Sequence, residues 1–177
     1  MSTSAATSRS TDPESRAYAE RKRLEKRNAA EEIGVDAEYI ASFVDRFYAK
    51  IRADDLLGPI FGERIADWGE HLDRMKRFWR SVLHNSGEFS GNPMLKHMII
   101  PGLEERHFAH WLELFYATLR EDEPHPEATR LVGSRARMIA DSLLTGIAMR
   151  REGLAGGRAG KDLPHVSTAP QAARPTR

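Results

Sequence analysis

Residues 68–83 read WGEHLDRMKRFWRSVL, and this stretch decides the fold class. Its large apolar residues recur at spacings of three and four, which is the pattern of one buried helix face. His71 falls in register with that face, so a polar ring is expected to point toward the core. The stretch therefore predicts an amphipathic helix that carries a histidine inward. Its apolar members are Trp68, Leu72, Met75, Phe78, Trp79, Val82 and Leu83.

A second helical pattern precedes this stretch. Residues 36–51 carry apolar side chains at the same spacing, and Asp36 stands where it can cap the first turn. Gly58-Pro59 interrupts the pattern before the central stretch begins. The apolar members of this second face are Ile40, Phe43, Val44, Phe47 and Ile51.

A short helix after the central stretch carries another histidine. Asn92-Pro93 has the composition of an N-cap followed by a first-position proline, and Pro101 ends the helix after about two turns. His97 lies in this helix among methionines and isoleucines. A helix of two turns contributes little packing of its own. A role in anchoring a metal through His97 would explain why the helix is present.

Two long helical patterns complete the predicted domain, over residues 108–119 and 131–147, with Pro124 and Pro126 between them. No run with strand periodicity competes with these helices, so the predicted fold class is all-α. The apolar members are Phe108, Trp111, Leu112, Phe115 and Leu119 in the first, and Leu131, Met138, Ile139, Leu143 and Ile147 in the second.

Composition excludes several classes of function. The 27 basic and 26 acidic residues nearly cancel, which gives no electrostatic reason to expect nucleic acid as a partner. The absence of cysteine excludes disulfides, thiolate metal sites and thiol nucleophiles. No stretch approaches the roughly 18 to 20 apolar residues that span a bilayer, and the N-terminus lacks an apolar signal segment, so we expect no membrane contact and a cytoplasmic location.

The chain divides into three parts by composition. Residues 1–33 are polar and charged on every side, which predicts a flexible or loosely helical arm. Residues 34–153 hold all the helical patterns and are the predicted domain. Residues 154–177 are rich in Gly, Ala, Pro and Arg. We predict a disordered tail, because so few large apolar side chains cannot bury enough surface to offset the entropy lost on ordering.

Four side chains with polar tips fall on or beside the predicted apolar faces: Tyr48, His71, His97 and Trp111. A buried donor or acceptor without a partner costs about 1–3 kcal/mol, so each tip needs a partner. Each one alone is more often a packed core residue than a ligand. Together they indicate a helical domain with a candidate internal ligand site, either a globin or a four-helix bundle.

Four ordered segments resemble group III truncated haemoglobins: FYAKIRADDLLGPIF, WGEHLDRMKRFWRSVL, GNPMLKH and HFAHWLELF. The likeness covers residues 34–153. The chain departs from the family pattern in its long arm, its tail and Phe89, where an aromatic hydroxyl is common. The resemblance is carried by Tyr48 with Phe61 thirteen residues on, His71 within W-x-x-H, the Phe78-Trp79 pair, the run ending at His97, and Trp111 fourteen residues later.

The resemblance implies a truncated globin, a two-over-two helical sandwich around haem b. It implies that His97 is the proximal iron ligand, and its other ring N–H is expected to donate to a backbone carbonyl. It implies a distal pocket of Tyr48, His71 and Trp111. His71 could donate to the ligand, swing outward as a gate or bind the iron as a sixth ligand. The other residues implied to line the haem are Phe61, Phe78 and Trp79.

The implied function is binding of dioxygen, nitric oxide and carbon monoxide, and nitric oxide detoxification would need a separate reductase. The phenol and indole donors predict slow oxygen release. Each hydrogen bond to the partly charged bound oxygen would increase its retention by roughly 10- to 150-fold. A haem-based sensor and a peroxidase-like protein are the haem alternatives. The non-haem alternatives are a helical interaction module and a carboxylate di-iron bundle built on Glu104-x-x-His107. The oligomeric state is left open.

Overall fold

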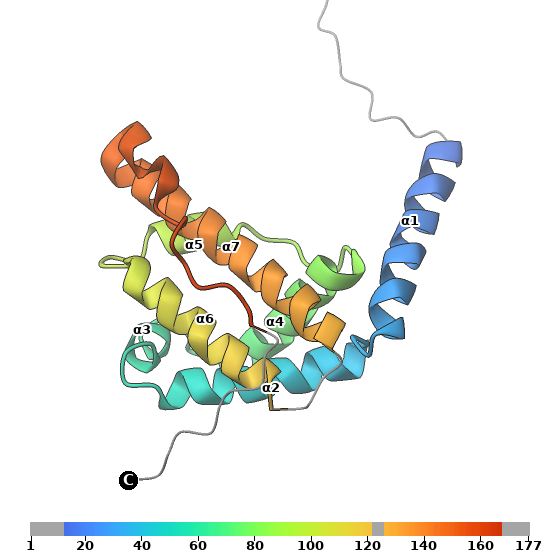
Figure 1. Ribbon diagram of the computed structural model, residues 1–177, viewed down its shortest axis with the longest axis horizontal. Helices are drawn as coiled ribbons and strands as arrows, with labels where there is room; N and C mark the ends of the chain where they lie inside the picture. Colours follow the sequence, from blue (N-terminus) through green and yellow to red (C-terminus); the bar gives the residue numbers. More distant parts are fainter. Residues whose placement is uncertain (1–12, 122–125, 168–177) are drawn as a thin grey trace, which may run out of the picture.

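The computed structural model describes residues 13–121 and 126–167, a part of the chain that is helical and has no strands (Figure 1). None of its helices is long and apolar enough to cross a membrane. Pro124, residues 1–12 of the arm and residues 168–177 of the tail lie outside the described residues. The helices are α1 Pro13–Glu32, α2 Ala37–Ala53, α3 Gly58–Gly62, α4 Trp68–His84, α5 Pro93–Met98, α6 Glu105–Leu119, α7 Pro126–Glu152 and the 3-10 helix η1 Gly153–Arg158.

The four long central helices form two pairs, which confirms the all-α, two-over-two fold. Helix α2 packs against α4, and α6 packs against α7. Helix α2 also contacts α6, which joins the two pairs, while α5 lies against α7. Figure 1 shows α1 projecting away from this body.

The helix starts are where the cap residues predict them. Asp36 accepts a hydrogen bond from the backbone N–H of Tyr39 at 2.7 Å, and Asn92 accepts one from Leu95 at 3.1 Å. Both satisfy a backbone donor that the first helical turn leaves unpaired. These two predicted caps are confirmed.

Aromatic rings from α2 and α6 fill the centre of the core. Phe47 and Phe115 are fully buried, with ring centroids 5.0 Å apart in an edge-to-face arrangement. Helix α7 presents small residues such as Ala136 and Ala140 to this core. The predicted inward position of Met138 was wrong, because its side chain is 57% exposed, whereas Leu143 and Ile147 of the same predicted face are buried.

Residues 154–167 do not form the disordered tail that composition predicts. Leu163 is 2% exposed, and the buried Arg137 of α7 donates hydrogen bonds to the carbonyls of Leu163 at 3.0 Å and Lys161 at 3.1 Å. Glycine lets the segment approach α7 closely, since a Cβ at Gly160 would collide with Asp141. Few apolar residues suffice because the segment packs on side chains of α7 and α6, including Arg137 and Tyr116, which donate to its carbonyls.

Helix α1 belongs to the predicted arm, and its mean hydropathy and exposure are those of a solvated helix. The C-terminal part of α1 nevertheless contacts the rest of the domain. Ala30 is 2% exposed, and the Lys26 ammonium donates to the carbonyl of Val82 at 2.9 Å. Burial and nearby Arg135 lower the pKa of Lys26. The C-terminal part of α1 is thereby tied to α4.

Candidate functional site

Tyr48 of α2 and His71 of α4 lie together where α2 packs against α4. Their ring centroids are 5.1 Å apart, at an interplanar angle of 81°. Phe61 of α3 lies on the same phenol ring, at 6.0 Å. Three elements that are separate in the sequence therefore bring these residues to one place.

Trp111 of α6 reaches this cluster through Phe47. The Phe47 ring lies 5.3 Å from Trp111 and 5.2 Å from Tyr48, edge-on to both. The structure thus brings three of the four polar-tipped residues predicted from the sequence, Tyr48, His71 and Trp111, into one aromatic cluster.

Tyr48 remains a neutral hydroxyl at physiological pH. Its side chain is 5% exposed, and burial raises the pKa of the phenol well above its usual value. No hydrogen bond joins its hydroxyl to another of the described residues. A neutral phenol in an apolar pocket is a donor that can point at a polar ligand.

His71 has a buried ring nitrogen without a partner. Its Nε2 is shielded from solvent and makes no hydrogen bond to any residue in the described part of the chain. Burial, followed by the positive charge of Arg74, lowers the pKa of the imidazole, so the ring is neutral near pH 7. An unsatisfied buried polar atom costs about 1–3 kcal/mol, and such a cost is expected where a ligand supplies the missing partner.

His97 of α5 is oriented by the backbone of its own helix. Its Nδ1 lies 2.7 Å from the carbonyl oxygen of Pro93. A carbonyl only accepts, so Nδ1 carries the proton and donates, which confirms the expected hydrogen bond to a backbone carbonyl. The lone pair of Nε2 is then available to a metal, and the hydrogen bond on the opposite nitrogen fixes the tautomer, as in metal-bound imidazoles.

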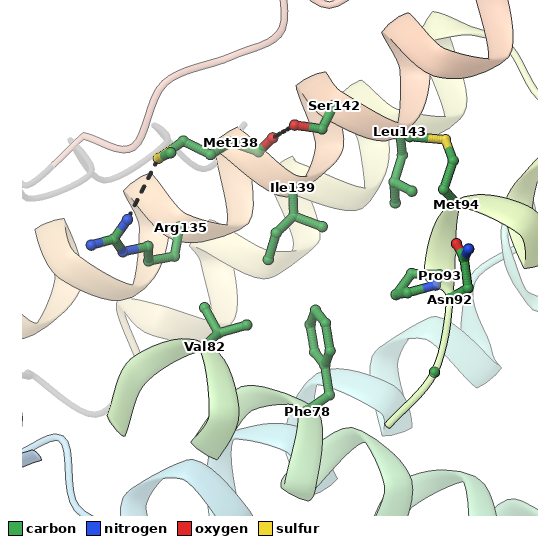
Figure 2. Close-up of a pocket in the computed structure, with 11 residues that line it drawn as sticks. Phe78, Val82, Asn92, Pro93, Met94, Arg135, Met138, Ile139, Ser142 and Leu143 are labelled. Atoms are coloured by element: carbon green, nitrogen blue, oxygen red, sulfur yellow. Dashed lines mark hydrogen bonds between the residues drawn. The ribbon is translucent and has the colours of Figure 1, made fainter. Parts of the chain in front are cut away.

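A cavity of about 440 Å³ lies between α4 and α7, beside the start of α5 (Figure 2). Figure 2 shows Phe78 pointing from α4 toward Ile139 of α7, with Pro93 and Met94 at one side. The walls are mostly apolar, and Pro93 is the residue whose carbonyl holds His97. The lining residues are Phe78, Val82, Gly91, Asn92, Pro93, Met94, Arg135, Met138, Ile139, Ser142 and Leu143.

The two aromatic residues of the Phe78-Trp79 pair face different surroundings. Phe78 borders the cavity and lies 5.1 Å from the ring of Phe89. Trp79 is 3% exposed and packs 5.1 Å from Phe115 in the core. Phe78 thus lines the cavity, whereas Trp79 packs against Phe78 from the side of the core.

The two histidines of α6 that the sequence places beside Glu104 have structural partners. The Nδ1 of His107 accepts from the backbone N–H of Glu104 at 3.0 Å, which makes this pair the capping box of α6. His110 lies 2.6 Å from Asp54. No group of three or more His, Asp or Glu within the described ranges could hold a metal ion, so the di-iron bundle lacks a ligand set there.

Trp68 and Arg52 belong to the cluster, although the sequence assigned them no role in the site. The Trp68 ring lies 5.8 Å from His71 and 6.5 Å from Tyr48, and the guanidinium of Arg52 lies 4.9 Å from the Trp68 ring centroid. The i,i+3 spacing of Trp68 and His71 was a readable signal, since such residues are neighbours on a helix. The contact of Arg52 with α4 had no local signal.

Two comparisons with known proteins agree. A group 3 truncated hemoglobin of Campylobacter jejuni is 34% identical to this chain over 110 residues, which is 60% of this chain and 86% of the relative. This chain belongs to the group III truncated haemoglobins. The crystal structure of a group III truncated hemoglobin from Campylobacter jejuni matches with a TM-score of 0.57 at 33% identity, over 62% of this chain and 88% of that chain. No protein-family model matches this truncated haemoglobin.

Globin-type ligand binding, and with it haem, follows from membership of this family. The residues present in this truncated haemoglobin fit such a group. His97 has its Nδ1 held by a backbone carbonyl, which leaves Nε2 to face a metal, and His71 has a buried nitrogen that no described residue satisfies. A non-covalent haem agrees with a chain that has no cysteine.

Proposed function

We propose that this truncated haemoglobin holds haem b through Nε2 of His97 and binds dioxygen, nitric oxide and carbon monoxide in a pocket of Tyr48, His71 and Trp111. The observation that carries the proposal is the buried, unpartnered Nε2 of His71 beside the buried phenol of Tyr48. A polar ligand between these groups would remove the cost of leaving them unsatisfied.

The apolar residues around α5 would exclude water from the haem. Phe78 of α4 and Leu143 of α7 line the open space beside α5, and Met94 of α5 closes one side (Figure 2). Trp79 and Phe61 would support the pocket from the core and from α3. An apolar surround strengthens each polar contact made inside it.

The distal side chains would hold a ligand by donating hydrogen bonds. The phenol O–H of Tyr48 and the indole N–H of Trp111 are both donors, and neither makes a hydrogen bond to another described residue. A hydrogen bond to a charged acceptor is worth about 1.5–3 kcal/mol, so each donor would slow release of a polar ligand. Prolonged retention suits chemistry on dioxygen better than rapid oxygen delivery.

When bound, haem supplies an iron that takes up diatomic gases and, once returned to the ferrous state, supports conversion of nitric oxide to nitrate. The protein's part is to retain dioxygen through Tyr48 and Trp111 while a second small molecule enters. Because no flavin or nicotinamide motif occurs in the sequence, we propose a separate reductase as the electron donor.

The test is haem uptake by the His97→Gly variant. We expect its haem affinity to fall by more than about 100-fold, because even an outer partner of a metal ligand contributes about 10- to 100-fold. Absorption spectra of the ferric, reduced and carbon monoxide forms report the haem, and added imidazole should restore uptake by filling the vacated space.

The matched control is His165→Gly, which removes an exposed histidine without a described partner. That variant should take up haem like the wild type. A His97→Gly protein with a normal reduced spectrum would show that another residue holds the iron, and a wild type that takes up no haem would refute the proposed function.

A further inference from the structure

Trp68 is the first residue of α4, and the local sequence fixes where its ring lies. The side chain of Asp67 accepts a hydrogen bond from the backbone N–H of Glu70 at 3.0 Å, which starts the helix at Trp68. His71 follows three residues later on the same helix face, and the two ring centroids are 5.8 Å apart at 81°. The indole thus meets the imidazole edge to face.

Arg52, near the end of α2, joins that helix to the first turn of α4 through the same indole. Its guanidinium carbon lies 4.9 Å from the Trp68 ring centroid, within the range of a cation–π contact. No ion pair joins Arg52 to a carboxylate among the described residues. The indole is therefore its partner, and the contact lies at the surface because the Arg52 side chain is exposed.

Two aromatic rings flank the imidazole of His71. Tyr48 lies on one neighbouring helix at 5.1 Å and Trp68 lies at 5.8 Å, both at 81° to the imidazole. No side-chain hydrogen bond to a described residue restrains the His71 ring, and its Nε2 is shielded from solvent. The ring can therefore leave its place without breaking a side-chain hydrogen bond to a described residue, and the indole of Trp68 lies on its flank.

We propose that Arg52 and Trp68 form a latch that keeps His71 in the pocket, so that opening of the latch sets how fast diatomic ligands enter and leave. Trp68 is in this sense a positioning residue that acts through His71. The inference rests on the proposed haem function for its effect on ligands, whereas the latch itself is a contact between protein side chains.

The test uses Arg52→Met, which keeps the length of the side chain and removes its charge, and Arg52→Lys, which restores a cation. Trp68→Leu removes the ring. The control is Arg130→Met, which removes the charge of an exposed arginine on α7. All four variants are compared with the wild type as haem-loaded, carbon monoxide-bound protein, after circular dichroism has shown that they fold.

Two readouts separate the latch from its effect on ligands. The first is the rate at which diethyl pyrocarbonate modifies His71, measured by peptide mass spectrometry, because outward opening of the ring exposes the shielded Nε2 to the reagent and raises this rate. Modification of the exposed His165 is the internal standard. The second is the association rate of carbon monoxide after flash photolysis.

Loss of a surface cation–π contact predicts that Arg52→Met speeds both rates by about two- to fivefold. Trp68→Leu should speed them further, while Arg52→Lys and Arg130→Met should stay near the wild type. Unchanged modification of His71 in Arg52→Met and Trp68→Leu would overturn the latch. Faster modification of His71 in these variants, with an unchanged association rate of carbon monoxide, would overturn the claim that the latch controls ligand entry. Failure of the wild type to take up haem would instead refute the proposed function, and modification of the haem-free protein would still decide the latch.

Discussion

At the scale of single residues, the surroundings of each histidine determine its part in the molecule. The Nε2 of His84 donates to the carbonyl of Val35 at 2.7 Å, deep in the core. His107 caps its helix, and His110 pairs with a carboxylate. Only His71, among the histidines of the described residues, leaves a shielded nitrogen without a partner. The same side chain therefore serves packing or capping, or is left open to a ligand, according to what lies next to it.

Replacing both distal donors should speed the release of dioxygen. Tyr48→Phe combined with Trp111→Phe keeps an aromatic ring at each position and removes the O–H and N–H groups, so we expect at least about a tenfold faster dissociation if the donors together contribute about 1.4 kcal/mol or more. Stopped-flow displacement of dioxygen by carbon monoxide measures the rate. Tyr116→Phe is the control, because its hydroxyl donates to the carbonyl of Pro164 away from the cluster. Equal dissociation rates in the double variant and the wild type would remove both residues from the distal role.

The ion pair between His110 and Asp54 should make stability depend on pH. The hydrogen bond to Asp54 is the main cause that raises the pKa of His110. Burial alone would raise the pKa of Asp54, but the hydrogen bonds from His110 and from the backbone of Leu57 lower it overall. A raised histidine pKa stabilises the fold below about pH 6.5, and this contribution is lost as pH rises through the folded value.

We therefore compare His110→Gln with the wild type by urea unfolding between pH 5.5 and pH 8.5. The variant keeps a donor for Asp54 but does not titrate, so it should be less stable by about 0.5–1 kcal/mol at the acidic end, and the difference should shrink as pH rises. Both pH values lie above the lowered pKa of Asp54, so the carboxylate stays charged throughout. His165→Gln should show no such trend, and a difference that grows with pH would contradict the assigned pair.

At the scale of elements, short segments hold their places through contacts with long helices. Helix α5 has only six residues, yet the N-cap of Asn92 and the close approach of Met94 to Gly146 of α7 define its position. The segment 159–167 has no regular helix, yet Arg137 and Tyr116 bind three of its carbonyls. A helix face that already exists can thus order a segment that would not order itself.

Leu163→Ala tests whether the segment 159–167 is part of the fold. The side chain is 2% exposed, and truncating a buried leucine costs about 2–5 kcal/mol, so we expect a loss of that size in the free energy of unfolding. Leu154→Ala is the matched control because that leucine is 91% exposed, and it should change stability by less than about 0.5 kcal/mol. Urea denaturation measures both. Equal, small effects would show that the segment does not pack in solution.

At the scale of the whole molecule, the two helix pairs enclose the candidate site and support it. Phe115 of α6 touches the rings of Trp111 and Trp79, at 5.0 Å and 5.1 Å. The aromatic cluster of Tyr48, His71 and Trp111 and the central core therefore share neighbouring side chains. A core change at Phe115 would reach the site through these rings, so stability and ligand binding are expected to change together.

The sequence by itself determined α2, α4, α5, α6 and α7, most of their buried faces and two of their caps, because periodicity and capping depend on neighbours within a few residues. It also singled out Tyr48, His71, His97 and Trp111, since polar tips on apolar faces are visible without a structure. The family followed from the same residues in order.

Only the tertiary structure decided which of these residues meet. The contact of Arg52 with Trp68 and the burial of Leu163 against α7 join positions that no local pattern connects. Composition predicted disorder for residues 154–167 because it counts only the apolar surface that a segment can bury by itself. In the structure, α7 supplies the surface against which Leu163 is buried. Local signals define elements, and the packing of those elements defines the site.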